Sequence, residues 1–317
     1  MNNKIFNEFG LVSVAVISYN SEKTILDTLK SVDRQSYPNE KIQVVISDDR
    51  SSDETITIIH RWAESNRKKF YEVLVLESNE NVGVSGNCTK AWKKCKGDWI
   101  KTIAADDILL SDCIESNIKF IRSKSPIIPS VVFSKVQVFS ETVNGVNLGR
   151  VLPTSAIEEI LEKSAEVQNK YLMTSGIPLA PSAFINRRAL EKIGYADERF
   201  KLIEDHPLWY RLTRQAHKLF YYPEITVRYR ISDSLSNSRE KLINLAYYRE
   251  IINIEERLIL PDIPKKYKLF RLRKRLWPRL VIFISIIFFN KRNFFSKSAL
   301  WLAMLIKPKH VRLGNQL

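Results

Sequence analysis

The sequence predicts an α/β protein with a mainly parallel central sheet, followed by a helical and basic C-terminal region. Short apolar runs alternate with helical stretches over the first hundred residues, the order expected of parallel strands joined by right-handed crossovers. These runs lack a strict alternation of apolar and polar residues, which indicates strands buried on both faces. In addition, an acidic pair follows each of three apolar runs. Strand ends of an open α/β sheet border a crevice that binds ligands, so the pairs predict a site there.

The first half of the chain predicts four strands with helices between them. The expected strands are Leu11–Ile17, Ile42–Ser47, Tyr71–Leu76 and Trp99–Ala104. The expected helices run from a cap at Asn20 or Ser21 to about Gln35, from about Glu54 to Lys68, and from the turn Asn79–Asn87 to Cys95. Lys96-Gly97 and Pro38 are expected to separate these elements.

After Asp107 the regular alternation ends. The expected helices are one near Ser111–Ser123, an amphipathic helix Thr154–Lys170, a helix Glu204–Gln215 and a last helix to about Leu260. The expected extended segments are Ser130–Ser140, a strand Ser182–Asn186 and two short strands, Leu219–Tyr222 and Ile225–Tyr229, around Pro223. A turn at Asn144-Gly145, a loop Ser175–Pro181 and a Ser-rich loop Ile231–Ser238 are expected to connect them.

Charge is concentrated at one end of the chain. The net charge is +15, and the residues from Ile263 to Leu317 contain eight Lys, six Arg and no Asp or Glu. The rest of the chain is therefore close to neutral. No apolar stretch reaches the ~18–20 residues that span a bilayer. The three cysteines lack metal-ligand spacing, and Met1–Gly10 lacks a secretory pattern. We therefore expect free thiols and a cytoplasmic location.

The acidic pair Asp106-Asp107 follows the fourth expected strand. Carboxylates at that position would hold Mg²⁺ or Mn²⁺, which in turn neutralises a diphosphate. The alternative is an acidic turn that caps the next helix. The position after the fourth strand of an α/β half favours the metal site.

Two further acidic groups are candidates. Asp49, after the second strand, would accept a hydrogen bond from uracil or from a ribose hydroxyl, whereas Asp53 is explained by helix capping. Asp205 in Glu204-Asp205 would serve as a general base, with Glu204 raising its pKa. The alternative for this pair is the start of a surface helix, in which His206 is structural. Between them, Gly83 and Gly86 in Asn79–Asn87 allow a close backbone approach to an anion.

Six motifs, in this order and spacing, resemble the family 2 glycosyltransferases, which are inverting, nucleotide-sugar-dependent enzymes of the GT-A fold. The motifs are Val14–Asn20, Asp48–Asp53, Asn81–Asn87, Lys96–Trp99, Ala105–Asp107 and Glu204-Asp205. The resemblance covers roughly Leu11 to Ser238 and is strongest to bacterial enzymes that build lipopolysaccharide O-antigen or capsule.

The resemblance implies a role for each matching residue. Tyr19 and Asp49 should contact the nucleotide base, and Asp107, with Asp106 nearby, should bind the metal and the donor diphosphate or ribose. Asp205 should deprotonate the acceptor hydroxyl. The same motifs place further donor-binding residues at Asn20, Asn81 and Asn87. The donor is expected to be UDP-linked and the acceptor a lipid-diphosphate-linked saccharide.

The expected organisation is a catalytic domain, 1–238, and a helical region, 239–317. The catalytic domain divides into a nucleotide-sugar half, 11–107, and an acceptor half, 108–238. Within 263–317, apolar runs too short to span a membrane alternate with basic residues, which favours attachment to an anionic membrane surface over packing on the catalytic domain. We therefore expect a peripheral protein on the inner face of the cell membrane. No nucleic-acid-binding module is legible.

Two alternative functions stay open at this point. A sugar nucleotidyltransferase shares the sheet, but it would have a Gly-rich loop directly after the first strand, where Ser18-Tyr19-Asn20-Ser21 stands. A non-catalytic, membrane-associated protein that retains the fold is the other alternative, and turnover of a donor would distinguish it.

Overall fold

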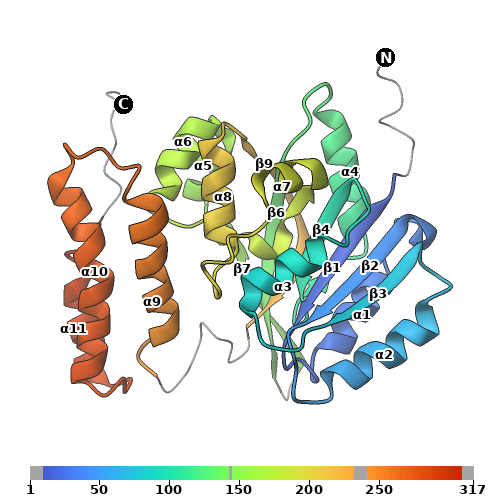
Figure 1. Ribbon diagram of the computed structural model, residues 1–317, viewed down its shortest axis with the longest axis horizontal. Helices are drawn as coiled ribbons and strands as arrows, with labels where there is room; N and C mark the ends of the chain where they lie inside the picture. Colours follow the sequence, from blue (N-terminus) through green and yellow to red (C-terminus); the bar gives the residue numbers. More distant parts are fainter. Residues whose placement is uncertain (1–9, 143–144, 232–240, 309–317) are drawn as a thin grey trace.

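The computed structural model describes residues 10–142, 145–231 and 241–308. A nine-stranded sheet forms its centre, and helices from the C-terminal part of the chain stand at one end (Figure 1). The strands follow the order β3-β2-β1-β4-β8-β6-β9-β5, and β7 pairs with β6 outside this path. The predicted α/β class is confirmed.

The N-terminal half of the sheet is parallel. It contains β1 (Val12–Ser18), β2 (Ile42–Asp48), β3 (Glu72–Glu77) and β4 (Trp99–Ala104). The helices α1 (Ile25–Asp33), α2 (Thr55–Asn66) and α4 (Cys113–Ser123) pack on one face, and α3 (Gly83–Trp92) packs on the other. β1, β2 and most of β4 are buried on both faces, which explains why they lack a strict alternation of apolar and polar residues, whereas the edge strand β3 is only partly buried.

The second half adds strands whose pairing is mixed, mostly antiparallel and in one case parallel. These are β5 (Ile108–Leu109), β6 (Val131–Thr142), β7 (Gly145–Leu152), β8 (Phe184–Asn186) and β9 (Leu219–Arg230). β8 pairs antiparallel with both β4 and β6, whereas β6 and β9 are parallel. The prediction of two strands around Pro223 was wrong. β9 is continuous, because register shifts opposite Ser134–Val136 accommodate the proline within the strand.

Four helices cover the second half: α5 (Ser155–Glu162), α6 (Ala165–Leu172), α7 (Arg187–Ile193) and α8 (Asp205–Arg214). The single helix predicted over Thr154–Lys170 was wrong, because Lys163 is extended and Ser164 starts a second helix by accepting from the Val167 N–H. The helix α7 was not predicted. It ends at Gly194, whose φ of 81° suits a residue without a Cβ.

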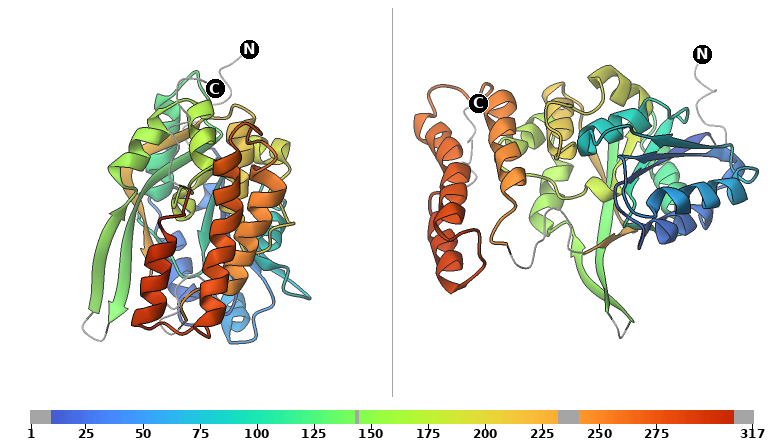
Figure 2. Two further views of the ribbon diagram at one scale, coloured as in Figure 1. Left: turned by 90° about the vertical axis from the view of Figure 1, so that its left-hand side faces the viewer. Right: turned by 60° about the horizontal axis from the view of Figure 1, so that its bottom comes forward.

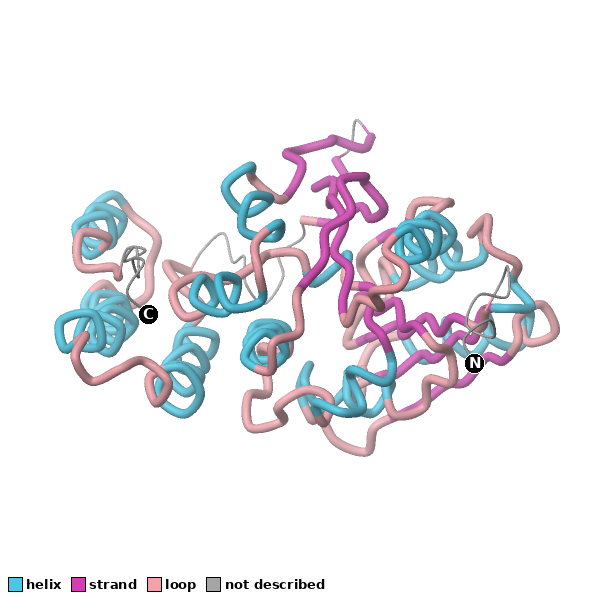
Figure 3. The backbone as a smooth tube through the Cα atoms, turned by 90° about the horizontal axis from the view of Figure 1, so that it is seen from above, coloured by secondary structure: helices cyan, strands magenta, loops and turns pink. Residues whose placement is uncertain are grey.

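The described C-terminal residues form helices: α9 (Leu245–Ile254), a π-helical turn (Glu255–Ile259), α10 (Lys268–Ile287) and α11 (Phe294–Ala303) (Figure 2). The start of this region packs on the α/β body, since Ile254, Leu258 and Phe270 belong to the same core cluster as Phe133 and Trp209. The helices α10 and α11 stand farther out, at the end of the molecule (Figure 3). None of the described helices combines the length and apolarity needed to cross a bilayer. Most of the predicted Ser-rich loop and the last nine residues lie outside the described residues.

Candidate active site

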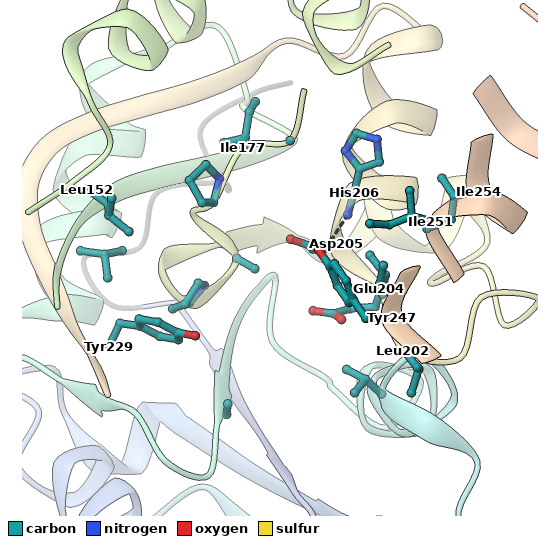
Figure 4. A pocket seen from close by; sticks show the side chains of 18 of the residues that line it. Leu152, Ile177, Leu202, Glu204, Asp205, His206, Tyr229, Tyr247, Ile251 and Ile254 are labelled. Atoms are coloured by element: carbon teal, nitrogen blue, oxygen red, sulfur yellow. Dashed lines mark hydrogen bonds between the residues drawn. The ribbon is translucent and has the colours of Figure 1, made fainter. Parts of the chain in front are cut away.

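A pocket of about 900 Å³ lies beside the carboxyl ends of β1 and β4. Two of the predicted acidic pairs line it, Asp106-Asp107 and Glu204-Asp205. The C-terminal helices contribute further lining residues, among them Tyr247, Ile251 and Ile254 (Figure 4). Because the volume is at the upper end of the range for small-molecule sites, the pocket has room for a ligand with more than one moiety.

Asp107 lies where the chain leaves β4 and is almost fully buried. Its Oδ1 atom accepts the backbone N–H of Arg230 at 3.0 Å, and its Oδ2 atom is buried without a hydrogen-bond partner. Burial, and then the neighbouring charge of Asp106, raise the pKa of Asp107 well above its ordinary value. An unpaired buried carboxylate oxygen is costly, so this atom calls for a cation or a donor group from a ligand.

Arg230, the last residue of β9, holds the turn that carries this pair. Its Nε donates to the carbonyl of Asp106 at 2.8 Å. The guanidinium forms an ion pair with Glu141 at 2.5 Å and lies over the ring of Phe139. Arg230 of β9 therefore holds the Asp106-Asp107 turn together with the turn's own hydrogen bond, in which the N–H of Asp107 donates to the carbonyl of Ala104 at 3.2 Å.

The residues at this end of the pocket fit a divalent cation whose coordination shell is completed by a bound substrate. Among the described residues no group of three or more His, Cys, Asp or Glu is arranged to hold a metal. Mg²⁺ is commonly bound by one or two carboxylates together with substrate phosphates. Asp107, with its free Oδ2, and Asp106 supply that number of ligands.

Glu204 and Asp205 form the start of α8 and lie in the centre of the view of the pocket (Figure 4). Burial, and then the charge of Asp205, raise the pKa of Glu204 to about 8. Burial also raises the pKa of Asp205, whose Oδ1 accepts the backbone N–H of His206 at 2.7 Å. A carboxylate with a raised pKa is a stronger base, so the pair is suited to accept a proton from a hydroxyl group.

Asp49 does not line the pocket. Its two carboxylate oxygens accept the backbone N–H groups of Val82 and Gly83, each at 2.9 Å, and so cap the start of α3. Gly83 has a φ of 81°, and an added Cβ would meet the carbonyl oxygen of Lys201, so a glycine is required there. Asn81 belongs to the same turn, and its Oδ1 accepts the N–H of Gly83 at 3.2 Å.

The other predicted donor-binding residues lie around the ends of β1 and β2. Tyr19 is exposed, and Asn20 accepts the backbone N–H of Ser52 at 2.8 Å. Asn87 is buried, and its side chain donates to the carbonyls of Ser18 and Ser47, which ties β1 to β2. None of these residues is among those lining the pocket.

Lys101 is a buried residue of the site region that the sequence interpretation missed. Its Nζ donates to the carbonyls of Thr102, Pro181 and Ala183, which joins β4 to the segment carrying Ala180 and Pro181 on the pocket wall. Burial lowers its pKa to about 8. The sequence signal that could have identified Lys101 is the presence of a charged residue within the apolar run of β4.

Residues 13–194 match glycosyl transferase family 2. The chain is 24% identical to the uncharacterized glycosyltransferase MJ1057 of Methanocaldococcus jannaschii, over 70% of this chain and 71% of that protein. It is 29% identical to the poly(ribitol-phosphate) beta-N-acetylglucosaminyltransferase TarS of Staphylococcus aureus, over 61% of this chain and 30% of TarS. A third relative is WfaP of Escherichia coli, a UDP-Glc:alpha-D-GlcNAc-diphosphoundecaprenol beta-1,3-glucosyltransferase, at 31% identity over 36% of this chain and 42% of WfaP. The chain therefore matches less than half the length of TarS and of WfaP.

Solved structures share the fold. The structure of residues 1–349 of S. aureus TarS with UDP-GlcNAc superposes with a TM-score of 0.60 at 20% identity, covering 94% of this chain and 82% of that one. The mannosyltransferase PcManGT of Pyrobaculum calidifontis, solved with GDP-Man and Mn²⁺, gives 0.53 at 16% identity, covering 93% and 69%. The family match covers more than half of the chain, and it includes the strands that end at the pocket. The chain belongs to glycosyl transferase family 2 and has the GT-A fold.

Proposed function

We propose that this glycosyltransferase moves a sugar from a UDP-linked donor to a hydroxyl group of a lipid-diphosphate-linked saccharide, with inversion at the anomeric carbon. The observation that carries the proposal is that Asp107, with an unpaired oxygen, and Asp205, with a raised pKa, line one pocket. The names of the relatives support the substrates, since TarS binds UDP-GlcNAc and WfaP acts on a sugar linked to diphosphoundecaprenol. Cell-surface polysaccharide synthesis, of the O-antigen or capsule type, is the proposed role.

At the donor end, Asp107 and Asp106 would hold Mg²⁺ or Mn²⁺ against the diphosphate. A bound cation would offset the negative charge that develops on the departing UDP. Tyr19 and Asp49 are proposed to reach the base, and Asn20, Asn81 and Asn87 to shape the surrounding turns. Asp49 would do so only by giving up one of its backbone hydrogen bonds, or by orienting the start of α3 toward the donor.

At the acceptor end, Asp205 removes the proton from the attacking hydroxyl. The bond between the acceptor oxygen and the anomeric carbon forms as the bond between that carbon and the UDP oxygen breaks. The electron pair of the broken bond leaves with UDP, and the proton remains on Asp205. Glu204 lies beside Asp205 with a pKa near 8 and is proposed to stay protonated at neutral pH.

We propose that the enzyme binds the inner face of the cell membrane, where the lipid part of the acceptor lies. Large apolar side chains are exposed around the turn between α10 and α11: Phe283, Ile286, Ile287, Phe289, Phe294 and Phe295. Lys291, Arg292 and Lys297 are exposed among them. Exposed aromatic and aliphatic side chains with adjacent cations suit the boundary between headgroups and acyl chains of an anionic membrane.

Donor turnover tests the proposal directly. The full chain is incubated with UDP-glucose, UDP-galactose and UDP-GlcNAc, a lipid-diphosphate-linked monosaccharide, and either Mn²⁺ or a chelator, and released UDP is measured. We expect one donor to be used in the presence of metal. The Asp205→Asn variant should lose turnover by a factor of about 10² to 10⁴, the usual contribution of a general base, while it still binds UDP.

Asp112→Asn is the matched control, because Asp112 is an exposed carboxylate at the start of another helix, α4, away from the pocket lining. It should behave as the wild type. Turnover of no donor under any condition would favour a non-catalytic protein, and loss of UDP affinity in Asp205→Asn would make Asp205 a donor-binding residue.

A further inference from the structure

The C-terminal helices close one part of the pocket with polar groups that the transfer chemistry does not use. Glu255 and Lys274 line the pocket and form a buried ion pair, and His206 lines it as well. The Glu255 Oε2 and His206 Nδ1 atoms are buried and have no hydrogen-bond partner. Two unpaired acceptor or donor atoms in one pocket indicate a place where a ligand supplies the missing partners.

The backbone at Glu255 departs from regular α-helical geometry. Glu255 begins a π-helical turn, in which the N–H of Leu260 donates to the carbonyl of Glu255 at 2.7 Å. Single π turns within α-helices often occur at functional sites. The preceding helix, α9, is fixed to the pocket wall because Glu250 accepts the backbone N–H of Leu202 at 3.0 Å.

The buried ion pair is better explained by function than by stability. Removing two charges from water costs several kcal/mol per ion, and a well-packed apolar pair of the same size is often at least as stable. Lys274 retains donor capacity beyond its bond to Glu255. The cluster therefore offers donors and acceptors within an otherwise apolar surrounding of Ile251 and Ile254 (Figure 4).

The net charge of this cluster favours an uncharged ligand over an anionic one. Lys274 and Glu255 cancel one another, and burial, followed by the charge of Lys274, lowers the pKa of His206 to about 4, so its ring is neutral at physiological pH. A phosphate or a uronic acid would bring a charge that nothing in the cluster compensates. Sugar hydroxyl groups both donate and accept hydrogen bonds, and the ring of Tyr247 on the same wall offers a flat apolar face.

We propose that His206, Glu255 and Lys274, with Tyr247, form a subsite for an uncharged sugar residue of the acceptor. The inference rests on the proposed function and names the substrate class on the acceptor side. Tyr247 lies beside Glu204 and Asp205 on the pocket wall (Figure 4), so a sugar packed against its ring has its hydroxyl groups in the part of the pocket that holds the base. The residue that occupies the subsite is therefore the one that receives the transferred sugar.

Binding of simple glycosides to the full chain tests this subsite. Methyl glycosides of glucose, galactose and GlcNAc are compared with methyl glucuronide and ribitol 5-phosphate by saturation-transfer NMR in the presence of UDP. We expect signals from uncharged glycosides and none from the two anionic probes. Glu255→Gln should weaken the binding of the uncharged probes by roughly tenfold to a hundredfold, the range for a hydrogen bond to a charged group.

Glu256→Gln is the matched control, because the neighbouring Glu256 forms an exposed ion pair with Arg279 on the same two elements. It should bind the glycosides as the wild type does. Tyr247→Ala provides a second variant with a partly exposed side chain, in case Glu255→Gln does not fold, and it should also lose glycoside binding. Melting temperature and UDP affinity establish that each variant is folded.

Three outcomes would overturn the inference: equal glycoside binding by Glu255→Gln and Glu256→Gln, unchanged binding by Tyr247→Ala, or equal signals from the anionic probes. The proposed function fails separately, if the wild-type chain neither binds UDP nor releases it from any UDP-sugar.

Discussion

At the residue scale, Glu204 links the site to the stability of the whole protein. Its pKa is about 8 in the folded chain, against 4.5 in an exposed position, because burial disfavours its charged form. The folded state therefore holds a proton on Glu204 at pH values where the unfolded state has lost it. The protonated Glu204 therefore contributes to the free energy of unfolding in full below about pH 4.5. This contribution decreases as the pH rises from there and is lost once the pH has passed about 8.

We predict that replacing Glu204 with Gln flattens the dependence of stability on pH. The free energy of unfolding of the wild type, minus that of Glu204→Gln, should fall between pH 5 and 8 by up to about 1.4 kcal/mol per pH unit, the limit for one proton. Urea unfolding at several pH values measures this difference. A difference that does not change with pH would show that Glu204 is not a buried protonated carboxyl group.

The positions of acidic residues in the sequence predicted one part of the candidate site, the two acidic pairs, but did not predict the part formed by the C-terminal helices. Asp106, Asp107, Glu204 and Asp205 were predicted because acidic pairs after apolar runs mark strand ends or helix starts facing a crevice, and these four residues line one pocket. Glu255 was not predicted. It lies within a helical stretch that carries no motif, and only packing against Lys274 of α10 brings it to the pocket.

At the scale of elements, the strands were easier to predict than the helices of the second half. β1, β2 and most of β4 are buried on both faces, so their composition identifies them without reference to the rest of the fold. The break between α5 and α6 depends on one extended residue, Lys163, and a Ser164 cap, which composition does not distinguish from a continuing helix. The pairing of β8 with both β4 and β6 depends on contacts between distant segments.

The link between β9 and the β4–β5 turn makes Arg230 a positioning residue for Asp107. Its backbone N–H and its Nε hold Asp107 and Asp106, and its guanidinium is anchored by Glu141. We predict that Arg230→Met loosens the turn and weakens metal-dependent transfer about tenfold or more at low Mn²⁺, because an interaction that orients a ligand typically contributes this much to metal affinity. Raising the Mn²⁺ concentration should restore much of the turnover.

Arg228→Met provides the control, since Arg228 is two residues earlier on the same strand and pairs with Ile108 in the sheet register. Its Mn²⁺ dependence should match that of the wild type. The positioning role would be refuted if Arg230→Met lost activity equally at all Mn²⁺ concentrations, which is the behaviour of a general loss of folded protein.

At the scale of the whole molecule, the α10–α11 turn and the pocket are connected. Asn290 in this turn donates to the carbonyl of Ile243 at 3.1 Å, and its Oδ1 accepts the N–H of Ile243 at 3.0 Å. The next residue, Asn244, caps α9 and lines the pocket. In Figure 1 the turn lies at the lower edge, toward which β1 also runs from its N-terminal end. A membrane that contacts the turn would therefore lie on the side of the strand ends that border the pocket.

We predict that the turn, rather than the whole basic region, determines membrane binding. Changing Phe289, Phe294 and Phe295 to Ser removes three aromatic side chains that are 85%, 77% and 70% exposed. Binding to vesicles containing phosphatidylglycerol, measured by co-sedimentation, should fall by at least tenfold, because each aromatic side chain loses its burial at the headgroup boundary. Changing Lys291 and Arg292 to Gln should weaken binding by about 1 kcal/mol per charge and remove part of its salt dependence.

The control for this prediction is the pair Ile127→Ser and Ile128→Ser, which removes two exposed apolar side chains, 59% and 53% exposed, from the segment after α4. These changes should leave vesicle binding as it is in the wild type. If they weakened it as much as the changes at the turn, the contact would be a general response to exposed apolar area and would not orient the pocket. If only the turn variants lose binding, acceptor KM should rise on vesicles and stay constant in detergent, because the membrane presents the acceptor to a pocket held at a fixed side of the molecule.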